Sequence, residues 1–281
     1  MRHHFRLFIT AMIISLALCA CQLQRQAPSD PRFVVTLVDQ SKTMTDFQLQ
    51  QYADLTKIAA SINGGDTLQI YPITENPLSS PDPISIALPP YDASRFNPST
   101  YHNYIEAQAF NQAREALARA KATIFEQELT MDTALIDSLE VAARAFHSSA
   151  GRGASHRELC LLSDMREDQH DKIRFPREKL TANRITELLD ILASEHRLPD
   201  LNGVQVWIAG ARIHRDSRRE FEDGVEAFWR AAFTRMGANA PVERFAPTLR
   251  DFPTNPELVQ RLIAGTPLVP TMRARIPINH R

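Results

Sequence analysis

A carboxylate and two hydroxyls follow an apolar segment near the start of the chain. Asp39, Ser41 and Thr43 stand at alternate positions directly after the apolar segment 33–38. Oxygen ligands of this kind suit a hard cation such as Mg²⁺, Mn²⁺ or Ca²⁺. In open α/β sheets, ligands gather at the carboxyl ends of the strands. The pattern therefore predicts a cation site at the end of this strand. The alternative is a local role, in which Asp39 and Ser41 form an Asx-type turn and cap the next helix.

The elements that must position these residues are short apolar strands separated by helical patterns. The strands are rich in Val, Ile and Leu and bounded by turn residues, which is typical of strands buried on both faces. The predicted strands are 33–38, 67–73, 158–163, 204–209 and 242–246, with an edge strand at 84–88 inside the proline-rich segment 76–98.

Apolar residues at three- and four-residue intervals predict helices between these strands. The predicted helices are 47–62, 104–128, one that begins near 133 and extends to 146, 180–196 and 218–236. Such alternation favours a doubly wound, mostly parallel sheet with helices on both faces.

The first residues predict export and lipid attachment. Basic residues precede an apolar run at 7–18, which is too short to span a bilayer but suits an export signal. The run ends in Leu18-Cys19-Ala20-Cys21, which resembles a bacterial lipobox with Cys21 as the lipid-bearing residue. Gln22, rather than Asp, then implies the outer membrane instead of the inner one. The alternative is a cleaved secretory signal that leaves no anchor.

These features divide the chain into a signal peptide at 1–20, a polar tether at 21–31, a domain at 32–250 and a proline-rich arm at 251–281. A short helix is predicted within the arm, at 256–263. A formal net charge of −1 predicts no bulk attraction to nucleic acid or to an anionic membrane surface. The membrane is therefore expected to be contacted through the lipid alone. Cys160 lies in an apolar run, where a buried and inert thiol is expected.

Three loops of this chain resemble the metal-ion-dependent adhesion site of von Willebrand factor type A domains. Asp39-Gln40-Ser41-Lys42-Thr43 matches the first loop of that family, with Thr43 in the last place. Thr133, just ahead of a predicted helix, matches the second loop, and Thr130 is the alternative. Leu161-Leu162-Ser163-Asp164-Met165 matches the third loop through Asp164, although many family members have Gly where this chain has Met165.

The resemblance implies a protein-binding module and no enzymatic activity. Five side chains would hold the cation, namely Asp39, Ser41, Thr43, Thr133 and Asp164. Three of them are neutral hydroxyls and some of the five are expected to act through water, so the first shell of the cation would keep net positive charge and an open position. The resemblance implies that a partner protein fills this position with a Glu or Asp carboxylate. The expected setting is the periplasm.

Two other functions fit parts of the same sequence. In a phosphohydrolase of the haloacid dehalogenase type, Asp39 would be the nucleophile, Ser163 the phosphate-binding hydroxyl, and Lys172 or Lys179 the balancing cation. Ser41 stands where that family has Asp, and no acidic pair follows strand 204–209. A structural envelope lipoprotein without bound metal is the other alternative. The charged run 166–172 reads as a solvated loop or as a rim of the cation site.

Overall fold

The computed structural model describes residues 30–79, 82–168, 173, 175, 180–213, 219–241 and 244–265. Six strands form one sheet in the order β3-β2-β1-β4-β5-β6. Neighbouring strands are parallel except β2 and β3, which are antiparallel. The strands are β1 (Arg32–Asp39), β2 (Thr67–Ile73), β3 (Ile84–Ala87), β4 (His156–Leu162), β5 (Val204–Ala209) and β6 (Phe245–Ala246). The predicted doubly wound α/β sheet and its edge strand β3 are confirmed.

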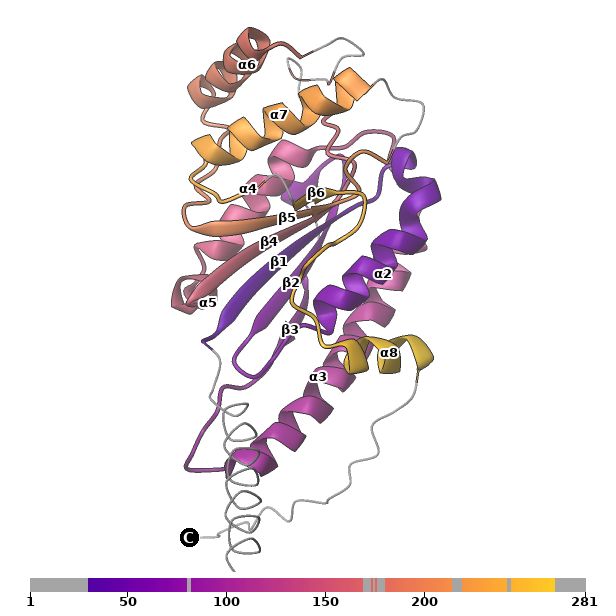
Figure 1. Cartoon of the computed structure of the whole chain (residues 1–281), viewed down its shortest axis with the longest axis vertical. Helices are drawn as coiled ribbons and strands as arrows, with labels where there is room; N and C mark the ends of the chain where they lie inside the picture. Colours follow the sequence, from indigo (N-terminus) through magenta and orange to yellow (C-terminus); the bar gives the residue numbers. More distant parts are fainter. Residues whose placement is uncertain are drawn as a thin grey trace, which may run out of the picture.

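Helices cover both faces of this sheet (Figure 1). One face carries α2 (Gln48–Ala59), α3 (Pro98–Ala120) and α8 (Pro256–Ala264), and the other carries α4 (Leu135–Phe146), α6 (Ala182–Ser194) and α7 (Arg219–Arg235). The short elements are η2 (Lys42–Phe47), η3 (Pro77–Ser79), the π-helical turn η4 (Lys121–Phe125) and α5 (Ser149–Gly153).

The central strand β1 shows why the strands carry apolar residues on both of their faces. Phe33, Val35 and Leu37 pack against the α4, α6 and α7 layer. Val34 and Val38 face α2 and α3. Because side chains alternate between the two faces of a strand, a strand covered on both sides needs apolar residues at successive positions.

The chain reverses direction across the sheet between β1 and β4. From β1 it continues to β2 on one side, whereas β4 continues to β5 on the other. The buried Gln51 of α2 lies at this fork, where its Nε2 donates to the carbonyl oxygens of Asp39 (3.2 Å) and Leu162 (2.8 Å). These are the last residues of β1 and β4, so one side chain ties the two strand ends together. Such a reversal is where doubly wound sheets bind ligands.

Several element boundaries differ from the prediction. The helix predicted at 104–128 begins earlier, at Pro98, because the side chain of Asn97 accepts from the backbone N–H of Thr100 and proline suits the first helical turn. Regular α-helix ends at Ala120 and continues as η4. Of the strand predicted at 242–246, residues 245 and 246 form β6, whereas 242 and 243 lie outside the described residues. The short helix α5 was not predicted.

Residues beyond β6 contribute to the core. Leu249, Phe252 and Leu258 are buried in the layer formed with α2 and α3. Phe252 packs edge-on against Trp207, with ring centroids 5.1 Å apart. The predicted helix at 256–263 is confirmed as α8, and this part of the predicted arm packs on the domain.

The predicted signal peptide and Cys21 lie outside the described residues, as does most of the predicted tether. None of the helices in the described part combines the length and apolar character that crossing a bilayer requires.

Candidate functional site

The first loop begins where β1 ends. An Oδ1 atom of the buried Asp39 accepts from the backbone N–H of Ser41 at 2.8 Å. The hydroxyls of Ser41 and Thr43 lie 2.8 Å apart. Ser41 is buried and Thr43 is exposed, so the group reaches from the interior to solvent. The Asx-type turn of the local alternative is present, but Ser41 makes no side-chain capping bond to η2. Its hydroxyl is therefore not explained by helix capping.

The third loop lies beside the first. Ser163 follows β4 and donates its hydroxyl to Oδ2 of Asp39 at 2.7 Å. The same hydroxyl accepts from the backbone N–H of Met165 at 3.0 Å. Asp164, which lies between Ser163 and Met165 in the sequence, is 2% exposed. Ser163 is therefore a member of the cluster that orients Asp39, a position that the cation hypothesis did not assign to it.

The two carboxylates influence each other. Burial raises the pKa of Asp39 to about 7, and the negative charge of Asp164 adds to this rise. Hydrogen bonds from Ser163 and Ser41 act in the opposite direction but are outweighed. Two acidic groups are thus held close together in a region poor in solvent, where a cation would stabilise both as anions.

The raised pKa of Asp39 predicts a pH-dependent stability in metal-free protein. The folded state binds a proton that the unfolded state releases near pH 4. This contribution is therefore fully present below pH 4 and is lost as the pH rises through about 7. We expect the free energy of unfolding of the native protein, relative to Asp39→Asn, to fall by about 2 kcal/mol between pH 5 and pH 8. Urea unfolding of both proteins in EDTA measures this, and an identical difference at both pH values would contradict it.

The second loop supplies a buried hydroxyl, that of Thr133. Thr133 is 1% exposed, and its Oγ1 finds no hydrogen-bond partner among the residues that the structure describes. The loop contacts both of the others. The carbonyl of Thr133 accepts from the N–H of Asp168 at 3.1 Å, and Thr130 pairs with Ser41 in an isolated β-bridge. Because a buried unpaired hydroxyl costs about 1–3 kcal/mol, a ligand for it is expected.

Thr130 shares this property. Its Oγ1 is also buried and lacks a hydrogen-bond partner within the described part of the chain. Its backbone is joined to the first loop through the N–H of Lys42, which donates to the Thr130 carbonyl at 3.0 Å. Both threonines therefore stay candidates for the second loop.

The charged run after Asp164 begins inside the protein, which corrects the expectation of a solvated loop. Glu167 is 1% exposed, and its Oε2 accepts from the backbone N–H of Ile136 at 2.8 Å. Ile136 lies in the first turn of α4, whose own N-cap residue Ala134 provides no side-chain bond. Glu167 thus caps α4 from the third loop and holds this helix, with Thr133 ahead of it, beside Asp164.

Arg166 connects the same loop to α7. Its guanidinium lies 2.8 Å from Oε1 of Glu222 and 3.9 Å from Oδ2 of Asp164, and it stacks over the ring of Phe221 at 5.2 Å. Its shorter ion pair is with Glu222. The part of the run that the structure describes is therefore built into the wall of the site.

Met165 explains how the third loop turns without glycine. Its φ is 66°, in the left-handed region that glycine adopts most easily, and its side chain is buried. Its carbonyl accepts from Nε1 of Trp229 at 2.6 Å. The loop therefore has a glycine-like turn that is held from α7 by the indole of a fully buried Trp229.

Trp229→Phe is expected to weaken cation binding by roughly 10-fold, ~1.4 kcal/mol, because the ring stays in the core while the bond to Met165 is lost. Trp207→Phe is the matched control, since Trp207 is also buried but its Nε1 has no hydrogen-bond partner among the described residues. It should lower stability and leave affinity unchanged. Calorimetric titration of Mn²⁺ measures both, and equal effects on affinity would show that Trp229 does not position this loop.

These contacts make a set of oxygen donors that fits a hard divalent cation. The structure brings together Asp39, Ser41, Thr43 and Asp164 and places the loop of Thr133 against them. Within the described ranges no three His, Cys, Asp or Glu side chains group to hold a metal. The predicted set has only two carboxylates, so hydroxyls must supply its other ligands. Whether these five residues bind a cation stays a prediction.

The phosphohydrolase alternative finds less support in the same geometry. Its phosphate-binding hydroxyl, that of Ser163, is engaged with Asp39 and Met165. The residues that end and follow β5 are Ala209, Gly210 and Ala211, which carry no carboxylate. Lys172 and Lys179 lie outside the described residues.

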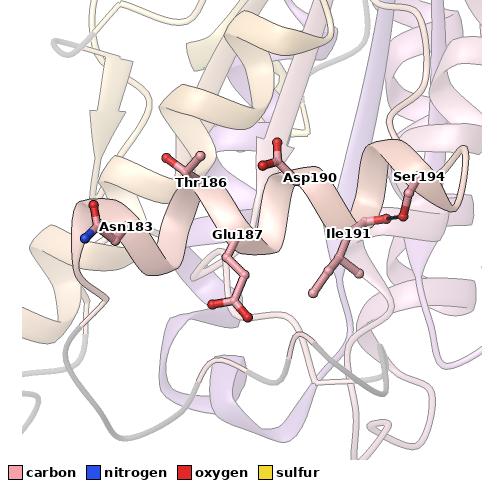
Figure 2. Close-up of a pocket in the computed structure, with 6 residues that line it drawn as sticks. All are labelled: Asn183, Thr186, Glu187, Asp190, Ile191 and Ser194. Atoms are coloured by element: carbon pink, nitrogen blue, oxygen red, sulfur yellow. Dashed lines mark hydrogen bonds between the residues drawn. The ribbon is translucent and has the colours of Figure 1, made fainter.

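A separate depression lies along the exposed face of α6. Figure 2 shows that its six lining side chains all project from this one helix. They are Asn183, Thr186, Glu187, Asp190, Ile191 and Ser194. Because all six belong to this helix, the depression lacks the polar groups that converge from different elements in a binding site.

No known family profile matches the sequence, and no curated protein matches it. Similar solved structures include a von Willebrand factor type A protein from Catenulispora acidiphila, with 13% identity over 84% of this chain and 41% of that one, at a TM-score of 0.38. The pilus adhesin SpaC of Lactobacillus rhamnosus GG has 11% identity over 85% of this chain and 30% of its own chain, at a TM-score of 0.40. The manganese-loaded TRAP protein of Plasmodium vivax has 11% identity over 72% of this chain and 64% of its own chain, at a TM-score of 0.37.

This chain thus spans less than two thirds of the length of each of these structures. The first of them carries the name of the family that the sequence resembles. The fold assignment itself rests on the strand order and crossovers described above.

Proposed function

We propose that this chain is a protein-binding module and not an enzyme, with a divalent cation held by Asp39, Ser41, Thr43, Thr133 and Asp164. When bound, the cation would accept an oxygen ligand from a partner. The residues of the chain hold the negative charges and hydroxyls in place: Ser163 orients Asp39, Glu167 fixes α4, and Trp229 fixes the turn after Asp164.

One observation carries the proposal. Among the described residues the hydroxyl of Thr133 is buried without a hydrogen-bond partner, in a loop that contacts the loops of Asp39 and Asp164, whose carboxylates repel each other. A local structural role for the loops leaves this hydroxyl unsatisfied within the described residues and does not remove the repulsion between the carboxylates. A cation of the Mg²⁺ type would satisfy both, because it takes hydroxyl and carboxylate oxygens together.

The exposed position of Thr43 supports an external ligand. One of the two carboxylates would bind through water, so that the first shell of the cation keeps net positive charge and favours a Glu or Asp side chain of a partner protein. This partner chemistry is tested by recovering proteins on the immobilised chain in Mg²⁺ or in EDTA. Proteins retained in Mg²⁺ should be lost in EDTA and on Asp39→Asn, but kept on Asp46→Asn, an exposed residue of η2. The same set of proteins under all four conditions would refute a cation-dependent partner.

We further propose that the chain is exported and attached to a membrane through lipid on Cys21, with the folded domain in the periplasm at the outer membrane. The support is the apolar run at 7–18 followed by Leu18-Cys19-Ala20-Cys21. Several acyl chains would give durable attachment, whereas one chain alone binds only marginally.

Cys21→Ser is expected to abolish incorporation of labelled palmitate and to release the protein from the membrane fraction. Cys19→Ser is the matched control and should change neither. Labelling and fractionation of cells that express each variant measure the result. Retention of label in Cys21→Ser, or its loss in Cys19→Ser, would contradict the assignment of Cys21.

A further inference from the structure

Four aromatic side chains gather where α3 begins, and we call them the aromatic pole: Tyr91, Phe96, Tyr101 and Tyr104. Phe96 stacks on Tyr104, with centroids 5.2 Å apart and planes at 20°, and Tyr91 meets Tyr101 edge-on at 5.0 Å. Tyr104 is 39% exposed, and the other three rings are partly exposed. Stacked aromatic rings thus face solvent at the end of a long helix.

The aromatic pole adjoins the point where the folded chain starts. Tyr101 donates its hydroxyl to the carbonyl of Pro89 at 2.8 Å. A Cβ placed on Gly65 would lie 3.7 Å from Pro31 and 3.9 Å from Pro90. Pro31, directly before β1, is therefore packed close to the segment that carries the pole.

The candidate cation site lies at the other end of β1. The strand begins at Arg32 and ends at Asp39, so the start of the folded chain and the three loops occupy opposite edges of the sheet. In Figure 1 the start of α3 is in the lower part of the molecule, and β1 runs from the lower part upward. A surface that touches the pole would leave the three loops free.

We propose that the aromatic pole rests on the headgroup region of the bilayer to which the chain is attached. This inference rests on the proposed lipid attachment at Cys21. Nine residues separate Cys21 from Pro31, which reach about 30 Å when extended and ~17 Å as a flexible coil. The pole is therefore held within reach of the bilayer. Tyr rings have an apolar body and a polar tip, which suits the boundary between acyl chains and water.

The net charge of the aromatic pole indicates which kind of lipid headgroup it would contact. Between Pro89 and Tyr104 the sequence has one Asp, Asp92, and one Arg, Arg95, which pair at 3.2 Å, and one His, His102, which is counted as neutral in the formal charge. The pole thus carries no net charge to attract anionic headgroups. We expect contact with zwitterionic phospholipid that does not change between low and high salt.

The inference assigns an orientation to the anchored domain. With the aromatic pole on the bilayer, the carboxyl edge of the sheet, with Asp39 and Thr133, points away from the membrane. The candidate site would then be presented to soluble partners or to proteins of the facing surface.

Quenching of tryptophan fluorescence by brominated lipid measures this orientation. Tyr104→Trp places a fluorophore in the pole, and Leu49→Trp places one at an 88% exposed position at the start of α2, close to the first loop. The native Trp207 and Trp229 are buried and supply a constant background. Each full-length variant is purified from membranes and reconstituted in phosphatidylcholine vesicles with bromine on the acyl chains. We expect at least about a 2-fold loss of the added emission for Tyr104→Trp and none for Leu49→Trp.

Mass spectrometry of the same samples detects the acyl chains on Cys21. The lipid-anchor proposal and the aromatic-pole proposal can therefore be refuted separately. Acylated protein with unquenched emission from Tyr104→Trp overturns the aromatic pole and leaves the anchor. Equal quenching of both variants also overturns it, since the domain would then have no preferred orientation. Protein without acyl chains overturns the anchor and the pole together, while cation binding by the three loops is unaffected.

Discussion

Asp39→Asn is expected to lower the affinity for Mn²⁺ or Mg²⁺ by at least about 100-fold, ~2.7 kcal/mol, without unfolding the protein. The substitution removes one of two negative charges. The amide keeps an acceptor for the N–H of Ser41 and gains a donor that can face the hydroxyl of Ser163. Because repulsion from Asp164 is relieved, the metal-free variant should be at least as stable as the native protein at pH 8.

Asp46→Asn is the matched control for this variant. Asp46 lies in η2, close in sequence to Thr43, but it is exposed and takes no part in the cluster. Calorimetric titration should give native affinity for this control. Native affinity in Asp39→Asn as well would show that the loops do not hold the cation. A variant that unfolds is identified by circular dichroism, and Ser163→Ala, which leaves both carboxylates, then provides the second measurement.

Thr133→Val is expected to weaken cation binding by about 100-fold while it stabilises the metal-free protein by about 1 kcal/mol. The two side chains have nearly the same shape. The hydroxyl that is removed is buried and makes no hydrogen bond within the described residues. Its loss therefore removes a desolvation cost when no cation is present and removes a ligand when one is bound.

Thr130→Val decides which threonine serves the second loop. The Oγ1 of Thr130 is equally without a partner in the described part of the chain, so both variants should gain stability without metal. Only the ligand should also lose affinity, and we expect that to be Thr133. A loss of affinity in Thr130→Val alone would move the assignment to Thr130. Native affinity in both variants would remove the second loop from the site.

The strands and the candidate loops could be predicted because their signals are local. Segments such as Val34 to Val38, in which Thr36 alone is polar, carry apolar residues on both faces, as a strand covered on both sides requires. Asp39 and Asp164 each follow such a strand. Once β1 and β4 are neighbours in a parallel sheet, their carboxyl ends must lie at the same edge.

The contacts that shape the site could not be predicted, because they join residues distant in sequence. Gln51 looks like an ordinary polar position of an amphipathic helix, yet its amide bridges the ends of β1 and β4. Glu167 belongs to a charged run, the usual signature of a solvated loop, and caps α4 instead. Ser163 was recognised only for the phosphohydrolase alternative. In each case the partner is a backbone or carboxylate group that only the folded chain brings near.

Helix boundaries in the structure differ from the predicted ones for a related reason. The start of α3 is set by Asn97 and Pro98, a capping signal that lies ahead of its apolar stripe. The end of the predicted helix at 128 is replaced by η4, where the amide of Gln40 donates to the carbonyl of Ile124 at 2.8 Å. The first loop thus contacts the end of this helix through a bond that no periodicity reveals.

Titration of Mn²⁺ into the metal-free native protein tests the central claim most directly. Two carboxylates and three hydroxyls on three loops, acting as one site, predict saturable binding of one ion per chain, displaced by Mg²⁺. The protein-bound ion should be detected by electron paramagnetic resonance as a loss of the free Mn²⁺ signal. A free Mn²⁺ signal that rises in proportion to added metal from the first addition, up to millimolar concentration, would contradict the account.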